Sequence, residues 1–343
     1  MYYFCTYFDR NYLPKGLALY QSLKRNIENF RLWILCMDQE TYKFLSLLNL
    51  PEANLISLDQ FENEDTKLLA AKRNRSRVEY YFTCTPSLPL FVFARDAQAD
   101  LVTYLDADLY FFSSPLSIFE EIDDHSIAII PHKFPPSLQY LEKNGIYNVG
   151  WLSFRRDEAG IACLERWRNQ CLEWCYDRNE NGRYADQKYL DDWPLSFENV
   201  VVLKHKGANL APWNISNYDI RFEDGTIRVD EQNLIFYHFQ GLFQTRTWLY
   251  QISFLEENYR ANWVVRRKLY SQYIEELTKI DRNISFLPGK RSAFRGIRGK
   301  GNGKTDEDLR YLYFFRGRLQ FWFYVAKNMI NGRYLFVLFN KVM

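Results

Sequence analysis

The sequence has few histidines and cysteines for its 343 residues, and it lacks any long apolar run. The four histidines and six scattered cysteines put no CxxC or histidine pair where a structural zinc site needs one, so no such site is predicted. The cysteines are expected to be reduced thiols in the core. Because no stretch of about 18 apolar residues occurs, no segment is expected to span a membrane by itself.

The first residues lack the features of a secretion signal. The apolar stretch from Met1 to Phe8 is short and has no basic leader, so we interpret it as a buried first strand and expect a cytoplasmic protein. The composition is 47% hydrophobic and 18% aromatic, which supplies a large core and excludes wholesale disorder. No internal repeat is present.

Charge is distributed unevenly along the chain. Residues 290–343 hold twelve Lys or Arg against three acids, a balance of +9, so the remainder carries −7 of the net +2. A basic, aromatic-rich tail suggests contact with an anionic membrane surface, whereas packing on the body or a solvated face explains it equally well. No recognised RNA-binding module accompanies the charge, and no nucleic acid partner is expected. We predict a catalytic domain at 1–285 and a helical C-terminal extension at 286–343.

Short β-branched and aromatic runs alternate with helical periods through the first half of the chain. This pattern predicts an α/β fold with a mostly parallel central sheet flanked by helices and a Rossmann-like start. Strands are expected at 2–8, 31–37, 54–58, 101–105 and 234–237. Helices are expected at 14–25, 39–48, 67–93 with a bend at its prolines, 157–175 and 248–280.

The strongest chemical signal is an apolar strand that ends in Asp106 and Asp108. Ligands of doubly wound sheets bind beyond the carboxyl ends of strands, and residues two apart in an extended segment project to one side. Two such carboxylates suit Mg²⁺ or Mn²⁺ carrying a diphosphate. Without this context, a helix cap or a solvated turn would be the better explanation of the pair.

Several blocks resemble GT-A fold glycosyltransferases, and most closely family 8, over roughly residues 1–250. Tyr104 to Asp108 (YLDAD) is similar to that family's YLDxD block, and Asp9 to Tyr12 (DRNY) to its DxNY segment. Tyr147 to Gly150 (YNVG) resembles its FNxG strand, and Asp186-Gln187 its DQ pair beside the transferred sugar. The resemblance implies catalytic roles for Asp186, Gln187 and Asn148.

Tyr237 to Gly241 (YHFQG) is similar to the HxxG block, whose histidine is the third metal ligand. The resemblance therefore implies a metal site of Asp106, Asp108 and His238, and a neutral imidazole is an acceptable Mn²⁺ ligand. It also implies a donor-binding set, which is Thr6, Asp9, Asn11, Tyr12, Asp106, Gly241 and Arg246. The family's diphosphate-binding lysine falls on Gln244, for which Arg246 is the substitute. Its arginine before the DxD has three candidates, namely Arg73, Arg75 and Arg77.

The implied activity is a metal-dependent, retaining hexosyltransferase that uses a nucleotide-sugar, expected to be a UDP-sugar. We expect the cation to be Mn²⁺ or Mg²⁺ and the acceptor to be a saccharide or a lipid-linked glycan of polysaccharide biosynthesis. Membrane contact by the tail would place such an acceptor at the inner face of the membrane. An inverting enzyme would need a carboxylate base, for which Asp186 and Asp191 are candidates. A sugar nucleotidyltransferase and a non-catalytic carbohydrate-binding protein of the same fold are the alternatives.

One loop leaves its role open. Asn209, Trp213 and Asn214 would suit contacts to a sugar, or Trp213 would simply anchor the loop. Asp191 and Asp192 have the same ambiguity.

Overall fold

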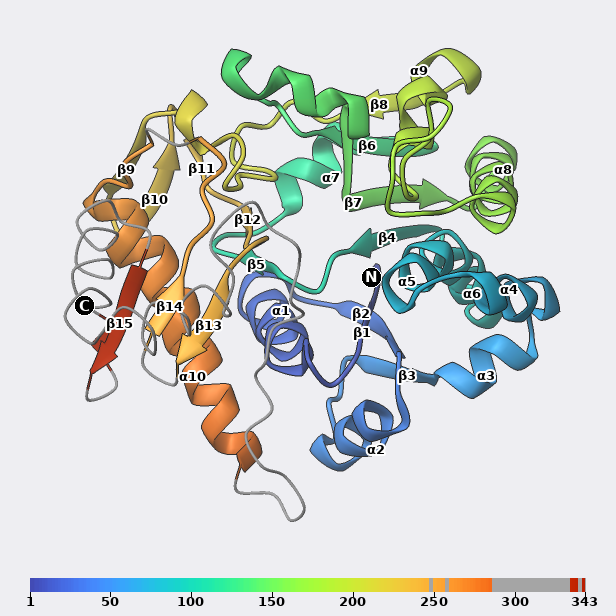
Figure 1. Cartoon of the computed structure of the whole chain (residues 1–343), viewed down its shortest axis with the longest axis horizontal. Coiled ribbons are helices and arrows are strands. Elements are labelled where there is room, and N and C mark those ends of the chain that lie inside the picture. The colour runs from blue at the N-terminus through green and yellow to red at the C-terminus, as the bar shows by residue number, and fades with distance from the viewer. Residues whose placement is uncertain (247–248, 257–258, 286–333, 339–340, 343) are drawn as a thin grey trace, which may run out of the picture.

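A seven-stranded sheet with helices on both faces forms the centre of the molecule (Figure 1). The computed structural model describes residues 1–246, 249–256, 259–285, 334–338 and 341–342. The strand order is β3-β2-β1-β4-β7-β6-β8. The strands are β1 (Tyr2–Phe8), β2 (Phe30–Cys36), β3 (Ala53–Ser57), β4 (Leu101–Leu105), β6 (Ile127–Pro131), β7 (Tyr147–Arg155) and β8 (Val200–Val202). Strand β7 is antiparallel to β4 and β6, and the other pairs are parallel, which confirms the mostly parallel sheet.

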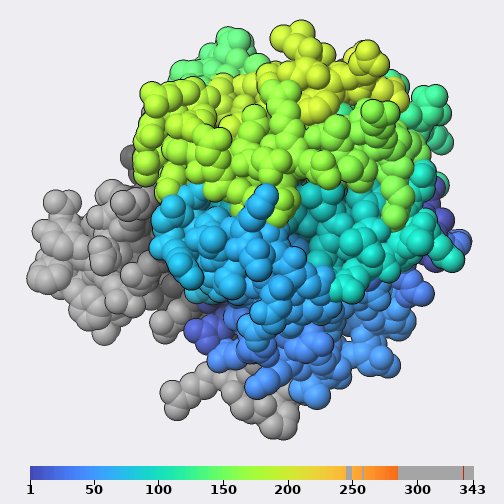
Figure 2. Space-filling model, turned by 90° about the vertical axis from the view of Figure 1, so that its right-hand side faces the viewer, coloured from blue at the N-terminus to red at the C-terminus, as the bar shows by residue number. Residues whose placement is uncertain are grey.

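Two buried clusters divide the helices between the faces of the sheet. Helices α1 (Leu13–Asn26), α2 (Gln39–Leu48), α7 (Leu116–Ile122) and α10 (Ser271–Ser285) pack on one cluster. The other is covered by α3 (Leu58–Asn63), α4 (Thr66–Ala71), α5 (Arg77–Cys84), α6 (Ser87–Arg95), α8 (Glu158–Glu173) and the short α9 (Trp193–Ser196). Figure 2 shows this second side as a continuous surface, with residues 60–95 in blue below the green of residues 150–190.

Local sequence signals set several helix boundaries. The carboxylate of Asp38 accepts from the backbone N–H of Thr41 at 2.7 Å and starts α2, and Asp157 caps α8 in the same way. Ser76 and Glu79 form a capping box at α5. The stretch predicted as one bent helix at 67–93 is divided into α4, a 3-10 turn (Lys72–Asn74), α5 and α6, because caps and prolines interrupt it.

Smaller sheets complete the fold. Strand β5 (Leu109–Phe111) pairs with β12 (Phe236–His238), and β9 (Ile220–Glu223), β10 (Thr226–Val229) and β11 (Gln232–Asn233) form a meander. Strands β13 (Phe243–Arg246), β14 (Leu249–Gln251), β15 (Tyr334–Leu338) and β16 (Lys341–Val342) form the last sheet. Within the described residues, four further 3-10 or π segments connect elements of the fold, namely Pro136–Asn144, Lys188–Asp192, Ile215–Asn217 and Val265–Tyr270.

The second half of the chain corrects two predictions. The helix predicted from residue 248 is wrong at its start, because Leu249 and Tyr250 are buried in β14 between β13 and β15. The described parts of the C-terminal region, β15 and β16, are strands and not helices, and the expectation for 286–333 falls outside the described residues. Pairing with neighbouring strands decided these conformations, and the local sequence pattern does not predict that pairing.

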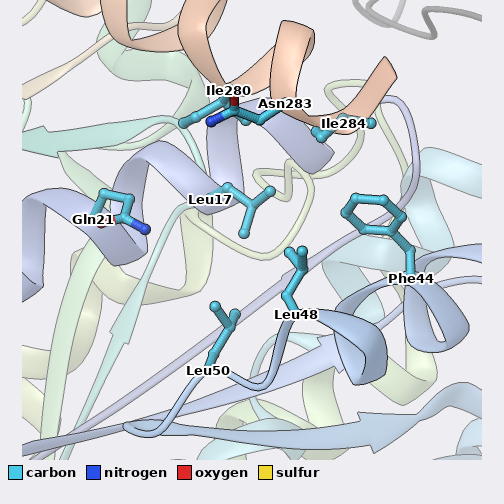
Figure 3. A pocket seen from close by; sticks show the side chains of 8 residues that line it. All are labelled: Leu17, Gln21, Phe44, Leu48, Leu50, Ile280, Asn283 and Ile284. Carbon is cyan, nitrogen blue, oxygen red and sulfur yellow. The ribbon is translucent and has the colours of Figure 1, made fainter. Parts of the chain in front are cut away.

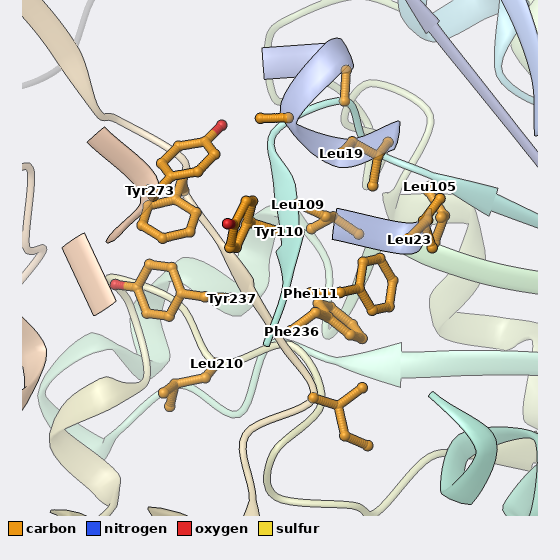
Figure 4. Packing of buried hydrophobic residues seen from close by; sticks show 14 of the residues in the cluster. Leu19, Leu23, Leu105, Leu109, Tyr110, Phe111, Leu210, Phe236, Tyr237 and Tyr273 are labelled. Atoms are coloured by element: carbon orange, nitrogen blue, oxygen red, sulfur yellow. The ribbon is translucent and has the colours of Figure 1, made fainter. Parts of the chain in front are cut away.

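Aromatic side chains fill the core between β5, β12, α1 and α10 (Figure 4). The ring of Phe239 stacks on Tyr273 with centroids 3.8 Å apart, and the hydroxyls of Tyr237 and Tyr270 lie 2.7 Å apart. All six cysteines are buried and free, as predicted. Among the described residues, no helix combines the length and apolar character needed to cross a bilayer.

A mainly apolar groove lies on the outside of the first cluster, between α1, α2 and α10 (Figure 3). It contains none of the residues predicted to do chemistry. Its lining consists of Leu17, Gln21, Phe44, Leu48, Leu50, Ile280, Asn283 and Ile284.

Candidate functional site

The ends of three strands meet at one edge of the central sheet. Because β1 and β4 are parallel neighbours, Asp9 and Asp106, the residues directly after them, emerge at the same edge. Strand β7 is antiparallel to β4 and so begins there, and the N–H of Asp106 donates to the carbonyl of Gly150 at 3.1 Å. The DRNY, YLDAD and YNVG blocks are thereby brought together.

His238 reaches this edge through the β5–β12 ladder. Its antiparallel partner is Leu109, and the N–H of Phe239 donates to the carbonyl of Asp108 at 2.9 Å. The imidazole Nε2 of His238 lies 3.1 Å from Oδ1 of Asp108 and 3.5 Å from Oδ2 of Asp106. The two carboxylates and the histidine each offer one ligand atom, and these atoms lie within 4.8 Å of one another. Two carboxylate oxygens and one imidazole suit Mn²⁺ or Mg²⁺, so the donor set fits the predicted cation.

The charges in this cluster depend strongly on one another. Burial opposes ionisation of Asp108, yet the positive charges of Lys15 and His238 outweigh burial and lower the pKa of Asp108. Asp106 has weaker support, and burial raises its pKa. For His238, burial lowers the pKa, but the two carboxylates outweigh burial and raise it. Asp108 is therefore the more firmly ionised member of the pair.

Gly150 permits the close approach of His238 to this edge. A Cβ atom at that position would lie 2.6 Å from Oδ1 of Asn148 and 2.9 Å from Nδ1 of His238. The glycine of the YNVG block therefore makes room for the imidazole, because any side chain there would push the histidine or the asparagine aside.

A second histidine, His132, orients Asn148. Its Nδ1 lies 3.2 Å from the carbonyl of Ile146, which only accepts, so Nδ1 carries the proton and Nε2 accepts from Nδ2 of Asn148 at 3.3 Å. Burial lowers the pKa of His132 to about 4, so the ring is neutral at pH 7. Oδ1 of Asn148 accepts from the N–H of Gly150 at 3.0 Å. Sequence reasoning missed His132, although it follows strand β6 directly, as His238 ends β12.

Asp186 forms a second buried acidic centre, with 5% of its surface exposed. Its carboxylate accepts from the hydroxyl of Thr85 at 2.9 Å, and Trp167 Nε1 donates to its backbone carbonyl at 2.8 Å. Burial raises the pKa of Asp186 to about 7. The neighbouring Gln187 donates from Nε2 to the carbonyl of Asn144 at 2.9 Å, which fixes the DQ pair beside the start of β7.

Two tyrosines lie between the acidic centres. The hydroxyl of Tyr104 donates to Oδ1 of Asp106 at 2.9 Å, and the hydroxyl of Tyr7 lies 3.2 Å from Oγ1 of Thr85. The two rings are 5.7 Å apart, so contact between Tyr7 and Tyr104 links the surroundings of Asp106 and Asp186. Neither Tyr7 nor Thr85 carried a sequence signal, because their role depends on contacts between β1, β4 and the α5–α6 junction.

Asp9 organises the loop after β1. Its Oδ1 accepts from the N–H of Asn11 at 2.8 Å and of Tyr12 at 3.3 Å, and its Oδ2 pairs with Arg77 and accepts from Tyr81 at 3.1 Å. Asp9 itself is 1% exposed. Among the three candidate arginines, Arg77 is therefore the one joined to the DRNY block.

Arg75 has a structural role instead. Its guanidinium donates to the last carbonyls of α8 and lies 4.1 Å from the ring centre of Tyr176. These contacts satisfy the end of a helix and leave the site to Arg77.

For the other predicted donor-binding residues, the structure gives their place in the fold. Thr6 is fully buried in β1, and its hydroxyl has no partner among the described residues. Gly241 follows β12 in a turn with φ of +73°. Arg246 is the last residue of β13, and Gln244 of the same strand donates to the hydroxyl of Tyr250 at 3.0 Å.

The loop left open by the sequence is buried. Trp213 Nε1 and Nδ2 of Asn214 both donate to the carbonyl of His132, at 2.9 and 2.8 Å. With Asn209 these side chains are at most 2% exposed, so the loop-anchoring role is favoured over stacking on a sugar. The indole of Trp213 packs edge-on against His238, with centroids 5.1 Å apart, and so supports the cluster from behind.

Asp191 and Asp192 are engaged in structural pairs. Oδ1 of Asp191 accepts from the N–H of Ile146 at 2.7 Å, and its Oδ2 pairs with Lys188 at 2.6 Å. Asp192 pairs with Arg166.

Lys15 is an unforeseen member of the site. Its Nζ lies 3.3 Å from Oδ2 of Asp108 and 4.4 Å from the ring centre of Tyr12, and only 2% of the residue is exposed. Nothing in its spacing on α1 marks it, because lysines on helices usually face solvent.

Two proteins of Bacillus subtilis (strain 168) resemble the chain in sequence. The uncharacterized protein YfnD is 34% identical over 243 residues, which cover 70% of this chain and 78% of YfnD. The uncharacterized protein YfnF is 32% identical over 312 residues, which cover 88% of this chain and 99% of YfnF. No protein-family profile matches the chain.

Among solved structures, the chain is similar to the galactosyltransferase LgtC in complex with donor and acceptor sugar analogues. The likeness has a TM-score of 0.51 at 15% sequence identity, and it covers 83% of this chain and 97% of LgtC. A likeness at this identity establishes the fold, and the predicted GT-A fold is confirmed.

Proposed function

The chain belongs to the same family as YfnD and YfnF of Bacillus subtilis, and we propose that it is a metal-dependent glycosyltransferase with a nucleotide-sugar donor. One observation carries the proposal. In a GT-A fold, Asp106, Asp108 and His238 converge at the strand ends with ligand atoms within 4.8 Å of one another. This is the edge at which α/β sheets bind ligands, and the donor set suits a cation that binds diphosphates.

Sugar transfer requires charge to be stabilised on the leaving diphosphate. Asp106, Asp108 and His238 would hold Mn²⁺ or Mg²⁺, which would supply that stabilisation as a Lewis acid. The residues of the chain hold this site in place before the donor arrives: the β5–β12 ladder positions His238, and Gly150 leaves it room. A site assembled in advance avoids reorganisation during the reaction.

In this proposal the DRNY loop binds the nucleoside of a UDP-sugar. Asp9 orients the backbone of Asn11 and Tyr12 through Oδ1, and Arg77 holds Asp9 through Oδ2. The other proposed donor-binding residues are Thr6, Gly241 and Arg246. The support for them is the resemblance of the sequence blocks to family 8 and, for Gly241, its place beyond β12.

Asp186, Gln187 and Asn148 are proposed to hold the transferred sugar. Asp186 is buried and bonded to Thr85, so it suits a positioning role beside the anomeric carbon better than that of an exposed base. Retention of anomeric configuration is the stereochemistry that this arrangement favours. NMR assignment of the product anomer tests it, and an inverted product would overturn it.

The acceptor is proposed to be a saccharide or a lipid-linked glycan of polysaccharide biosynthesis. The basic balance of +9 over residues 290–343 supports a site of action at the inner membrane surface, next to the catalytic domain at 1–285. Pelleting with anionic liposomes tests this part, since a full-length chain that stays in the supernatant would contradict it.

A thermal-shift screen of UDP-, GDP- and ADP-sugars, each with Mn²⁺ and with EDTA, tests the central proposal. A ligand that binds the folded state raises the melting temperature, so one donor is expected to stabilise the chain only with the cation. Hydrolysis of that donor to free sugar and nucleoside diphosphate would then exclude a non-catalytic binding protein. Stabilisation by a nucleoside triphosphate with a sugar phosphate would point instead to a nucleotidyltransferase.

A further inference from the structure

Lys15 is buried against a predicted ligand of a divalent cation. Its Nζ lies 3.3 Å from Oδ2 of Asp108, and its side chain is 3% exposed. On the same helix Lys24 pairs with Glu52 and is 45% exposed. Burying a lysine is costly unless it is paired, so the position of Lys15 demands a partner that stays ionised.

The two oxygens of Asp108 face different partners. Oδ2 faces Lys15, whereas Oδ1 faces Nε2 of His238 at 3.1 Å. The ion pair therefore holds the carboxylate in one orientation and leaves Oδ1 directed at the other ligands. Lys15 acts through Asp108 in this way, as a positioning residue.

Lys15 also changes the total charge of the site. With both carboxylates ionised and His238 neutral as a ligand, Asp106, Asp108 and Lys15 together carry −1, and without Lys15 the total would be −2. With Lys15 present, a bound divalent cation would therefore leave the site with a net charge of +1, which only an anion can balance.

We propose that Lys15 couples the binding of the cation to the binding of a nucleoside diphosphate group. By cancelling one carboxylate charge, Lys15 weakens the site for a free divalent cation and favours the cation together with its anionic ligand. The inference rests on the proposed function, because it takes Asp106, Asp108 and His238 to be the metal ligands. A purely structural ion pair between α1 and the YLDAD turn is the competing explanation, and it predicts no coupling.

The test is a titration of the full-length chain with Mn²⁺, in which EPR measures the free ion, without nucleotide and with saturating UDP or GDP. For the unaltered chain, nucleoside diphosphate is expected to tighten Mn²⁺ binding by roughly tenfold or more, a typical size for coupling between sites. For Lys15→Met, Mn²⁺ alone is expected to bind about tenfold tighter, because a unit charge is removed near the cation. In this variant, the increase in Mn²⁺ affinity caused by the nucleotide should be smaller by a similar factor.

Two controls complete the experiment. Lys24→Met removes an exposed lysine from the same helix and is expected to leave both affinities unchanged. Lys15→Arg keeps the charge and is expected to keep the coupling. Lys15→Gln, which keeps a hydrogen-bond donor toward Asp108, replaces the methionine variant if circular dichroism finds that variant unfolded.

The outcomes separate the two claims. If the unaltered chain and the neutral Lys15 variants bind Mn²⁺ with the same affinities and show the same nucleotide effect, that result would overturn the coupling and leave the proposed function intact. Absence of Mn²⁺ binding under every condition would instead overturn the proposed metal site itself. By linkage, Mn²⁺ must increase the affinity of the chain for UDP or GDP by the same factor. Isothermal titration calorimetry measures that factor without any turnover.

Discussion

Asp108 and Asp186 are both buried carboxylates at the same edge of the sheet, yet their surroundings give them opposite properties. Asp108 lies between Lys15 and His238, whose charges lower its pKa against the effect of burial. Asp186 has the neutral hydroxyl of Thr85 as its partner, and burial raises its pKa to about 7. Equal burial therefore produces an ionised group suited to a cation in one place and a half-protonated group suited to a sugar in the other.

The largest effect is expected when the charged centre, formed by Asp106, Asp108, His238 and Lys15, is broken. Asp108→Asn removes a metal ligand and leaves Lys15 without its partner, so donor turnover should fall by roughly 10²–10³-fold or more. Mn²⁺ titration and donor hydrolysis measure the loss. Glu64→Gln, which alters an exposed pair with Arg95, is the matched control. Retained Mn²⁺ affinity in a folded Asp108→Asn variant would contradict the assigned ligand.

Gly150→Ala tests how closely the charged centre is packed. The added Cβ would meet Asn148 and His238 inside 3.0 Å, so we expect a loss of roughly 1–3 kcal/mol of stability from overpacking together with weaker Mn²⁺ binding. Urea denaturation and Mn²⁺ titration measure the two effects. Gly182→Ala is the control, because a Cβ there meets nothing within 4 Å and only the strain of φ +72° remains. Equal effects of both substitutions on Mn²⁺ binding would refute this role of Gly150.

The stability contributed by the buried carboxyl of Asp186 is expected to depend on pH. Because the folded pKa of Asp186, about 7, lies above the usual value of 3.8, folding favours its protonated form. Its stabilising effect is therefore complete below pH 4 and is lost as pH rises to about 7. Asp186→Asn removes this dependence, and relative to the unaltered chain it should gain up to about 4 kcal/mol at pH 8 and little at pH 4.

Urea denaturation in EDTA at several pH values between 4 and 8 measures this difference. Parallel curves for the two chains would show that Asp186 is ionised throughout. Asp65→Asn, at a carboxylate paired with Arg168, provides the comparison for an acid in an ion pair.

The smallest effect is expected at Thr85. Its hydrogen bond favours the ionised form of Asp186, so Thr85→Val should raise the pKa of Asp186 further, by up to about one unit if the bond contributes 0.5–1.5 kcal/mol. The midpoint of the pH dependence of stability should then shift upward. Thr41→Val, at a buried threonine of α2, is the control. A downward shift would mean that the hydroxyl supports the protonated carboxyl instead.

Most of the first half of the fold was predictable, because its signals are local. Strands β1 and β4 and helix α2 have their predicted bounds, and β2 and β3 differ by one residue at each end. Prediction failed at β14, where a short apolar segment was interpreted as the start of a helix. Short apolar runs fit either structure until a partner strand is known, and the partner β15 lies far along the chain.

The site divides in the same way. Asp106, Asp108 and His238 were predicted as one group, since each stands at the end of a strand within a block that resembles a known family. Lys15, His132 and Thr85 were not, because single residues of these types occur throughout the sequence and only their neighbours give them a role.

The sequence by itself determined the alternation of strands and helices, the carboxylates after β4 and the order of the blocks around them. These features follow from periodicity, capping and short spacings that the chain carries locally. Only the tertiary structure decided that Asp108 has a buried lysine beside it and Asp186 a hydroxyl. Electrostatic character depends on the charges within a few ångströms, and those charges come from segments that the sequence separates and the sheet brings together.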